Sequence, residues 1–408
     1  MPNPATKAVV VGAGIVGLAT ACRLAESGYD VTVIERLGAP GAGASRGNGG
    51  QLLFDRISAM GSPAFLRALP HSLLDRSQGL KVQGLAHPSR WPWARRFLRE
   101  SSQAGWQRNT AKMLALAHLS RQSFDAFRTR HEICFAWRRP GKLVTYATAQ
   151  GVEAAAKAAA FQGQFGGRHE IVSRQECFTL EPALAHTSRP IAGAVYLPDA
   201  EVGDCHRCCR ELARILQTKL GGKIIFNTTL TGLESASGRI VGLRCAKRII
   251  GGDLFVIATG MAAGSFLPRS FSGCKPIVSV LGLSLTYPVG TNPPNLSVTD
   301  ASGRFVIARL GNRLRVAGGA LFSDRLRIRV SDVQVLKSKA EALMPQAARF
   351  EAAPEPWIGG RPQTPDDLPM IGRAEFENLF VNAGHGSLGW TLAFGSAERL
   401  LHTVSERS

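Results

Sequence analysis

Hydrophobic and polar positions follow a regular order over the first 35 residues. Ala8 to Val11 form a short apolar run, which is typical of a strand buried on both faces. Apolar residues from Ile15 to Leu24 then recur at the spacing of one helix face, and Gly28 follows where a left-handed cap would end that helix. Residues 31–34 form a second apolar run. We therefore predict a strand, a helix and a second, parallel strand.

Three glycines lie between the first strand and the helix, in the G-x-G-x-x-G order. Gly12 allows a sharp turn, Gly14 lets a pyrophosphate approach the backbone, and Gly17 lets the helix pack closely on the sheet. Glu35 follows about 20 residues later, where a carboxylate binds ribose hydroxyls and repels a 2′-phosphate. The alternative is an ordinary glycine-rich turn, but strand, helix, cap and acid all stand in register. We predict a dinucleotide site that disfavours NADP.

The pattern changes along the rest of the chain. Residues 60–135 are mostly helical in period, and strands are expected at 141–147 and 191–197. Asp204 stands where it would cap another helix. Several segments of residues 276–330 alternate apolar and polar positions, which predicts an antiparallel sheet separate from the parallel first unit.

A second glycine triplet stands near the end of the chain. Gly384, Gly386 and Gly389 follow an apolar strand and precede a helix expected from about Thr391 to Leu401. The chain ends too soon for a second dinucleotide fold, so we expect this triplet to serve the first site. The positive end of the helix would favour an anionic group such as a reduced flavin.

Composition adds one strong feature, a net charge of +19 over 408 residues. Such a charge implies attraction to membrane lipid, nucleic acid or an acidic partner, and charge alone does not choose among them. Segment 89–100, SRWPWARRFLRE, mixes tryptophan with arginine, which suits a membrane interface or a core helix with a basic outer face. The sequence has no apolar run of membrane-spanning length, and we expect no signal peptide.

The eight cysteines are expected to be free thiols in a reducing compartment. Cys205, Cys208 and Cys209 with His206 could form a metal or redox cluster. No second cysteine pair stands at zinc-site spacing, so we expect these residues to pack in a helix and predict no metal site.

Six segments carry a family resemblance over nearly the whole chain. They are the opening unit ending in Glu35, ASRGNGGQL at 44–52, LPDAEVGDC at 197–205, RLGNRLRVAGG at 309–319, GGRPQTPDDLPMIG at 359–372 and NAGHGSLGWTLA at 382–393. On these residues the chain resembles the bacterial FAD-dependent D-amino-acid dehydrogenases, of the small subunit type, within the superfamily of glycine oxidase and D-amino-acid oxidase.

This resemblance implies an α/β fold with an α+β substrate domain. A Rossmann-like FAD-binding domain would be assembled from residues 1–85, 170–270 and 355–408. An antiparallel-sheet substrate or cap domain would comprise residues 86–169 and 271–354.

The resemblance also implies FAD as the cofactor, held by residues from several segments. The expected cofactor-binding residues are Gly12, Gly14, Ile15, Val16, Gly17, Glu35, Arg36, Ser45, Asn48, Gly49, Gly50, Gln51, Leu52, Leu230, Thr259, Gly260, Arg361, Gly384, His385, Gly386, Leu388, Gly389, Trp390 and Thr391.

The implied reaction transfers a hydride from the α-carbon of an amino acid to flavin N5, and the imino acid then hydrolyses to a 2-oxo acid and ammonia. Arg361 is the expected partner of the substrate carboxylate, because a guanidinium binds carboxylates bidentately. A structural ion pair is the alternative role for Arg361. His385 would contact the substrate or tune the flavin, unless it is only a core residue. We expect no catalytic dyad or triad.

One segment departs from the family. A Lys-Gly-Tyr-Ser run is replaced by Leu281, Gly282, Leu283 and Ser284. If that strand faces the substrate, the pocket is more apolar than usual, and this would favour apolar or cyclic amines.

Three functions are compared on this basis. The first is a D-amino-acid dehydrogenase that passes electrons to a quinone, cytoplasmic or peripheral on the inner face of the cytoplasmic membrane, with contact to anionic lipid. The second is a related oxidase or dehydrogenase of glycine, sarcosine, D-proline or hydroxyproline. The third is a tRNA-modifying flavoenzyme, although we expect no nucleic acid, because no RNA-binding module is recognisable.

Overall fold

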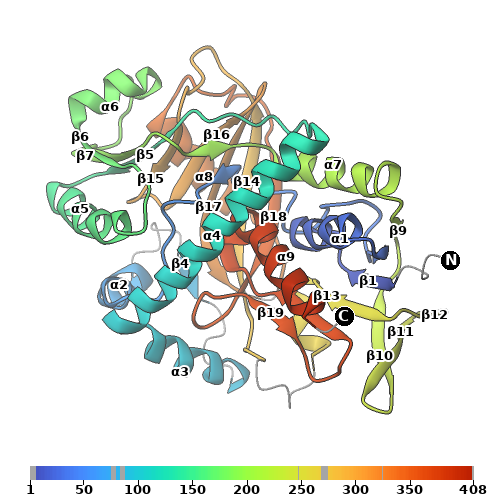
Figure 1. Ribbon diagram of the computed structural model, residues 1–408. Helices are drawn as coiled ribbons and strands as arrows, with labels where there is room; N and C mark the ends of the chain where they lie inside the picture. Colours follow the sequence, from blue (N-terminus) through green and yellow to red (C-terminus); the bar gives the residue numbers. More distant parts are fainter. Residues whose placement is uncertain are drawn as a thin grey trace.

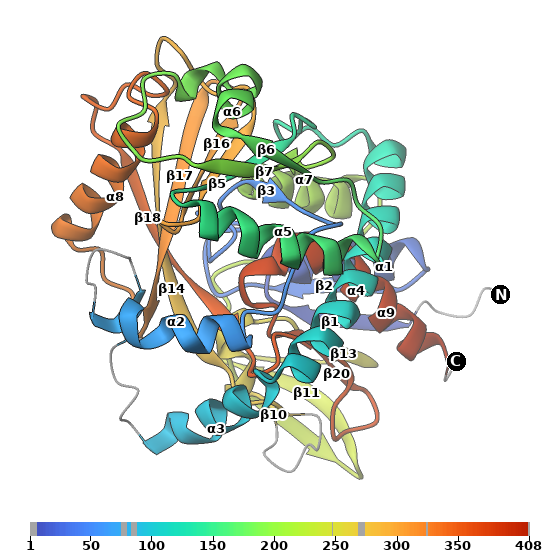
Figure 2. The same ribbon diagram turned by 90° about the vertical axis from the view of Figure 1, so that its left-hand side faces the viewer.

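The computed structural model describes residues 6–74, 80–82, 88–246, 248–267, 274–323 and 325–406. Two main sheets form the framework of the molecule. One sheet is mainly parallel, and we call it the parallel sheet; the other has nine strands, and we call it the large sheet. Figures 1 and 2 show the two sheets and the helices that cover them.

The parallel sheet begins with the predicted opening unit, which the structure confirms. β1 pairs in parallel with β2 and with β13, and β13 pairs in parallel with β20. In spatial order the strands are β19 (Met370–Arg373), β20 (Leu379–Ala383), β13 (Leu254–Ile257), β1 (Lys7–Val11), β2 (Asp30–Ile34) and β9 (Lys223–Ile225). The chain therefore returns to this sheet from distant segments.

Both faces of the parallel sheet are buried, as the apolar run in β1 predicts. Val10 lies in the cluster formed with the helices of one face, whereas Val9 and Val11 contact the small sheet on the other. The covering helices are α1 (Ile15–Glu26), α4 (Gln103–His131), α7 (Cys205–Thr218) and α9 (Gly389–Ser405). The small sheet contains β10 (Leu230–Ala236), β11 (Arg239–Cys245) and β12 (Arg248–Ile250).

The large sheet is mainly antiparallel, as the alternating pattern predicts. Its strands, in spatial order, are β18 (Glu355–Gln363), β14 (Val278–Pro288), β17 (Arg313–Phe322), β16 (Phe305–Leu310), β15 (Ser297–Asp300), β5 (Lys142–Tyr146), β7 (Gly193–Leu197) and β6 (Glu170–Ser173), with β4 (Leu80–Val82) beside β17. α8 (Val330–Leu343) covers one face, and α5 (Ala149–Gly163) lies on the other.

The remaining elements are short or peripheral. They are β3 (Gln51–Leu52), β8 (Glu201–Val202), α2 (Pro63–Leu74), α3 (Trp91–Glu100), α6 (Arg174–Leu180), η2 (Pro88–Arg90), η3 (Pro182–Leu184), η4 (Gly260–Ser265) and η5 (Gly386–Leu388). The predicted cap of α7 is confirmed, because Asp204 Oδ1 accepts hydrogen bonds from the backbone N–H of His206 and Arg207, at 3.1 and 3.2 Å.

Strand pairing and helix packing cross the boundaries of the expected domains in three places. β7, within residues 170–270, pairs with β5 of the large sheet, and β6 of the same range pairs with β7. β18, within residues 355–408, pairs with β14. α4, within residues 86–169, packs on α9 and α1 instead of on the large sheet. The reason is that hydrogen bonding and burial join residues distant in sequence, so chain order does not fix which sheet a strand or helix joins.

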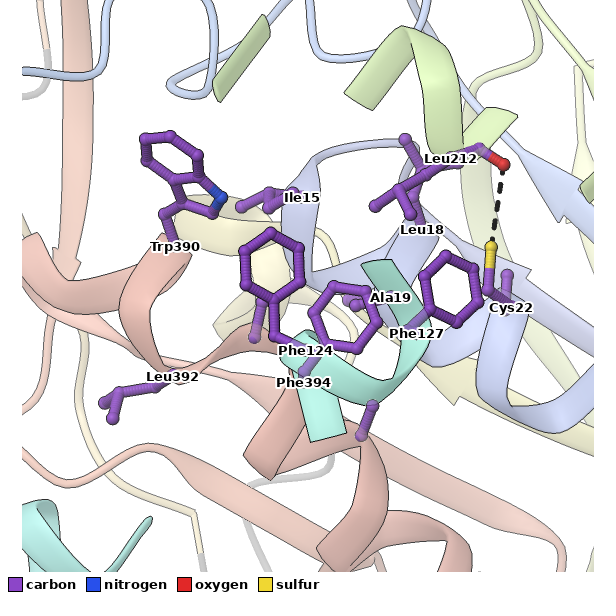
Figure 3. Packing of buried hydrophobic residues seen from close by; sticks show 14 of the residues in the cluster. Ile15, Leu18, Ala19, Cys22, Phe124, Phe127, Leu212, Trp390, Leu392 and Phe394 are labelled. Atoms are coloured by element: carbon purple, nitrogen blue, oxygen red, sulfur yellow. Dashed lines mark hydrogen bonds between the residues drawn. The ribbon is translucent and has the colours of Figure 1, made fainter. Parts of the chain in front are cut away.

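Packing between α4, α9 and α1 explains the position of α4. Phe124 and Phe127 of α4 contact Phe394 of α9, with ring centroids 4.9 and 5.2 Å apart. Figure 3 shows these rings beside Ile15 and Leu18 of α1. Cys205, Cys208 and Cys209 are buried in the same cluster, in agreement with the packing role predicted for them.

Candidate functional site

The predicted cofactor residues gather at one edge of the parallel sheet. Gly12 follows β1, Glu35 follows β2, Thr259 and Gly260 follow β13, and Gly384 follows β20. These four strands run in parallel, so their carboxyl ends meet at the same edge. Ligands of open α/β sheets bind at this edge.

The glycine turn after β1 leaves no room for a side chain at Gly12 and Gly17, whereas a Cβ on Gly14 would lie 3.6 Å from Ser45 Oγ, an ordinary contact. Gly12 has a φ of 110°, and a Cβ there would lie 2.6 Å from the carbonyl oxygen of Ala258. A Cβ on Gly17 would lie 1.9 Å from the carbonyl oxygen of Gly12. The turn therefore brings the start of α1 directly against the strand end, where the free N–H groups of a helix attract phosphate.

The carboxylate of Glu35 is fixed next to this turn. Its Oε2 accepts a hydrogen bond from the backbone N–H of Ala13 at 2.7 Å, and its Oε1 accepts one from Leu37 N–H at 2.9 Å. Each oxygen keeps a further lone pair for a ribose hydroxyl. Arg36 is exposed, and Leu230 is buried beside Val11 and Ile34.

Residues 44–52, which we call the 44–52 loop, cross from the glycine turn to the large sheet. Ser45 Oγ accepts a hydrogen bond from the backbone N–H of Ile15, the first residue of α1, at 3.1 Å. Asn48 Oδ1 accepts one from Gly50 N–H at 2.9 Å, which tightens the loop. A Cβ on Gly49 would lie 3.1 Å from Val306 of β16, so the loop lies against the sheet.

Arg361 and His385, the expected catalytic residues, are brought together by β18. Gln363 of β18 forms an isolated β-bridge with His385. A Cβ on Gly386 would lie 2.6 Å from Gln363 Oε1, and one on Gly360 would lie 1.8 Å from Met261 Sδ. β18 therefore places Arg361 close to the edge of the parallel sheet where the predicted cofactor residues gather.

The guanidinium of Arg361 has donors that the described residues leave unused. Its Nη1 donates to the carbonyl oxygen of Gly319 at 3.0 Å, and within the described residues it forms no ion pair. Burial lowers the pKa of Arg361, which reflects the cost of a cation without an acidic neighbour. Gly282 makes room for it, since a Cβ there would lie 2.4 Å from Nη2. The arrangement suits a carboxylate-bearing ligand.

His385 is buried, with 3% of its surface exposed. Burial lowers the pKa of His385 to about 3, so the imidazole is neutral at physiological pH. Its Nε2 has no hydrogen-bond partner among the described residues, and the same holds for the hydroxyl of Thr259. A neutral ring next to a ligand edge can give or receive one hydrogen bond there.

The second glycine triplet leads into α9, which begins at Gly389, two residues before the expected start at Thr391. No side chain in the described part of the chain caps the first turn of α9, so its N–H groups remain available. Leu388 and Thr391 flank this helix start, while the Trp390 side chain packs into the core against Phe135 and near Ile15 (Figure 3). Trp390 could therefore reach a ligand only through its backbone.

Leu281 and Leu283 lie on the face of the large sheet opposite Arg361. Arg361 pairs with Val280 in a continuous register, and alternate residues of a strand point to opposite faces. Leu283 packs in the cluster beneath α8. Ser284 and Trp357 share the face of Arg361, and the sequence analysis did not single out either as a site residue. The alternation was visible in the sequence, but the register with Arg361 was not.

These residues fit a long dinucleotide cofactor. The glycine turn after β1 and Glu35 lie at one end of this edge of the parallel sheet. The polar atoms of Thr259 and His385 that lack a partner among the described residues lie further along it. Such a division suits FAD, whose ADP half and flavin ring need separate binding surfaces.

Comparison with known proteins gives the same cofactor class. The family model described as FAD dependent oxidoreductase matches residues 7–402. D-amino acid dehydrogenase 2 of Ralstonia nicotianae is 37% identical, with 98% of this chain and 96% of the relative covered. D-amino acid dehydrogenase of Vibrio vulnificus is 32% identical, with coverages of 98% and 96%.

Solved structures support the fold. L-proline dehydrogenase from P. horikoshii superposes with a TM-score of 0.74 at 18% identity, covering 100% of this chain and 95% of the other. Glycine oxidase from Bacillus cereus gives a TM-score of 0.72 at 18% identity, with coverages of 99% and 96%.

Proposed function

Because the chain belongs to the family of FAD dependent oxidoreductases, we propose that it catalyses the FAD-dependent oxidation of D-amino acids to 2-oxo acids and ammonia. Relatives at 37% and 32% identity over nearly their full length carry the name D-amino acid dehydrogenase. The observation that carries the proposal is the guanidinium of Arg361, which lacks an acidic partner in the described structure and lies beside the cofactor edge.

The residues of this chain position the substrate. Arg361 binds the α-carboxylate through its free donors, which fixes the α-carbon relative to the edge of the parallel sheet. His385 stays neutral, so it does not compete with Arg361 for the carboxylate. When bound, FAD supplies the acceptor for the hydride that leaves the α-carbon. The amine is deprotonated before oxidation, and the resulting imino acid hydrolyses in solution.

Reduction of the bound flavin tests this proposal directly. The protein is loaded with FAD and mixed under argon with single D-amino acids, their L-enantiomers, D-proline, sarcosine and glycine. We expect the flavin absorbance to bleach with D-amino acids and not with L-amino acids. Bleaching by glycine or sarcosine alone, or by no D-amino acid, would refute the proposed substrate class.

The orientation of β14 favours primary D-amino acids over cyclic amines. The expected shift to cyclic substrates depended on Leu281 and Leu283 facing the pocket. Leu283 instead packs beneath α8, and the register places Leu281 on that same face, away from Arg361. The described structure thus gives no apolar wall at these positions, and D-proline serves as a comparison substrate.

We further propose that the electrons pass to a quinone at an anionic membrane surface. Trp91 and Leu98 of α3 are 61% and 57% exposed, and Arg95 and Arg99 are exposed on the same side. Residues 325–330, RLRIRV, are exposed throughout. Exposed apolar side chains interleaved with arginine are typical of interfacial binding.

The two exposed segments, α3 and residues 325–330, lie next to the same buried cluster. Trp93 and Phe97 of α3 are buried with Phe322 of β17, which precedes residues 325–330 by a few residues. α3 is therefore both a packed helix and an exposed basic surface. No helix among the described residues has the length and apolarity to span a membrane. In vesicle sedimentation we expect binding to phosphatidylglycerol and not to phosphatidylcholine; equal binding to both, or to neither, would oppose the proposal.

A further inference from the structure

Several buried polar residues lie on one face of the large sheet, as the register of its paired strands shows. Residues paired across neighbouring strands point to the same side of a sheet. Lys142 pairs with Ser297, Ala308 with Arg315, and Ser284 with Ala317. The pairs between β15, β16, β17, β14 and β18 extend this face from Lys142 to Arg361.

The 44–52 loop crosses this face almost one strand at a time. A Cβ on Gly47 would lie 2.1 Å from Trp357 of β18 and 2.9 Å from Ser284 of β14. Arg315 Nη1, from β17, donates to the carbonyl oxygens of Arg46 and Asn48 at 3.2 and 2.8 Å. A Cβ on Gly50 would lie 2.9 Å from Leu310 of β16. The loop is therefore held on the sheet along its length.

Gln51 ends the crossing at β15 and β5. Its Nε2 donates to Ser297 Oγ at 2.6 Å, and its Oε1 accepts a hydrogen bond from Lys142 Nζ at 2.8 Å. Lys142 is 6% exposed and has no ion pair within the described residues. Burial lowers the pKa of Lys142 to about 7, and the field of Arg56 adds to this effect. A buried amine without an acid weakens the fold, so its presence calls for a functional reason.

The other end of the loop is fixed at the cofactor edge. Ser45 Oγ accepts a hydrogen bond from Ile15 N–H at the start of α1, where the pyrophosphate of FAD would bind. The loop is thus tied at Ser45 to the parallel sheet unit and at Gln51 to the large sheet. Its position relative to the cofactor depends on both ties.

We propose that Lys142 is a positioning residue for FAD, which acts through the side-chain amide of Gln51 to hold the 44–52 loop at the cofactor edge. The proposal rests on the proposed function only in taking FAD as the cofactor. Lys142 does not touch FAD; it fixes Gln51 to the large sheet. The hydroxyl of Ser297, which accepts a hydrogen bond from Gln51, and the cation Arg315, which donates to the loop backbone, complete the attachment.

A double-mutant cycle on FAD retention tests the proposal. Kd for FAD is measured from flavin fluorescence after dilution of the FAD-loaded enzyme, for the parent, K142M, Q51M and K142M/Q51M. Loss of a charge-assisted hydrogen bond raises Kd about tenfold. We expect each single substitution to raise Kd by this factor, and the double substitution to raise it no further. K142R, which keeps a donor, should recover most of the affinity.

An exposed lysine provides the control for this experiment. Lys157 is an exposed lysine paired with Glu153, so K157M should leave Kd unchanged. A Kd for K142M within about twofold of the parent, or effects of K142M and Q51M that simply add, would overturn the proposal. Circular dichroism identifies a variant that fails to fold, and K142R then decides the question. Since no substrate is used, failure here leaves D-amino-acid oxidation untouched, and the reverse also holds.

Discussion

Among the described residues the guanidinium of Arg361 donates to one carbonyl oxygen and has further donors free, so these residues do not satisfy this cation. We expect R361Q to lower kcat/KM for D-amino acids about 100-fold, because a charge-assisted bidentate contact is lost. R361K keeps the charge but not the planar donors and should lose about tenfold. Stopped-flow flavin reduction gives the rates. A structural ion-pair role would instead predict that R361Q unfolds or loses FAD while its remaining active fraction reacts normally.

The neutral state of His385 leads to a prediction about the pH dependence of kcat/KM. Since its pKa is lowered to about 3 by burial, its charge does not change between about pH 5 and 9. The pH profile of kcat/KM should therefore follow the substrate amine, and H385Q should lower the rate without moving the profile. An inflection near pH 6 that disappears in H385Q would show that His385 titrates, against this expectation.

Lys142 links stability to pH in the opposite direction from a typical paired lysine. Its folded-state pKa is lowered to about 7 from an ordinary value of 10.5. Between these two values the unfolded chain binds a proton that the folded chain does not, so stability rises with pH by up to about 1.4 kcal/mol per unit. Below about pH 7 both states are protonated and the term is constant.

The pH dependence caused by Lys142 allows its effect on unfolding stability to be measured apart from its effect on FAD affinity. In urea unfolding of the protein freed of flavin, K142M should lack the rise between pH 7 and 10.5 and should be more stable than the parent at pH 7. A variant that is more stable yet holds FAD less tightly would agree with a positioning role. An unchanged pH slope in K142M would contradict the buried, depressed state of this amine.

At the scale of elements, the contact between β1 and α1 depends on one glycine. A Cβ on Gly17 would lie 1.9 Å from the carbonyl oxygen of Gly12, so G17A must shift α1 away from the strand. We expect a loss of about 1–3 kcal/mol in unfolding free energy and a large loss of FAD affinity. G251A is the matched control, because a Cβ at Gly251 meets nothing within 4 Å. Equal FAD affinity in both variants would argue against a cradle at this turn.

Elements set by local rules were predictable from the sequence, whereas their partners were not. The turns at Gly12 and Gly384 follow from short-range sterics and strand–helix periodicity, and the structure has both. β7 is expected as a strand at 191–197, but nothing in its sequence states that it pairs with β5. Likewise, the alternation along β14 defines two faces, and only the register with β18 shows which face carries Arg361. Non-local pairing is therefore the part of the structure that the sequence alone does not predict.

Lys142 illustrates the same limit for single residues. In sequence it is one cation among 49 lysines and arginines, at the start of an unremarkable strand. Its contact with Gln51 spans 91 positions and arises only when the 44–52 loop crosses the large sheet. This lysine is distinguished by burial without an acidic partner among the described residues, which is a property of the packed structure.

At the scale of the whole molecule, the net charge of +19 predicts how the proposed membrane contact responds to salt. Long-range attraction to anionic lipid is screened within a few ångströms at about 0.5 M salt, whereas burial of apolar side chains is not weakened. We expect sedimentation with phosphatidylglycerol vesicles to fall with salt, while some binding of the parent protein remains at high salt.

The variants W91S/L98S and L326S/I328S should each lose the binding that remains at high salt, because they remove exposed apolar side chains and leave the net charge unchanged. V241S/I249S alters exposed apolar residues of the small sheet and should bind like the parent. If all three double variants bind alike, the attraction is a property of the net charge alone and α3 and residues 325–330 form no membrane surface.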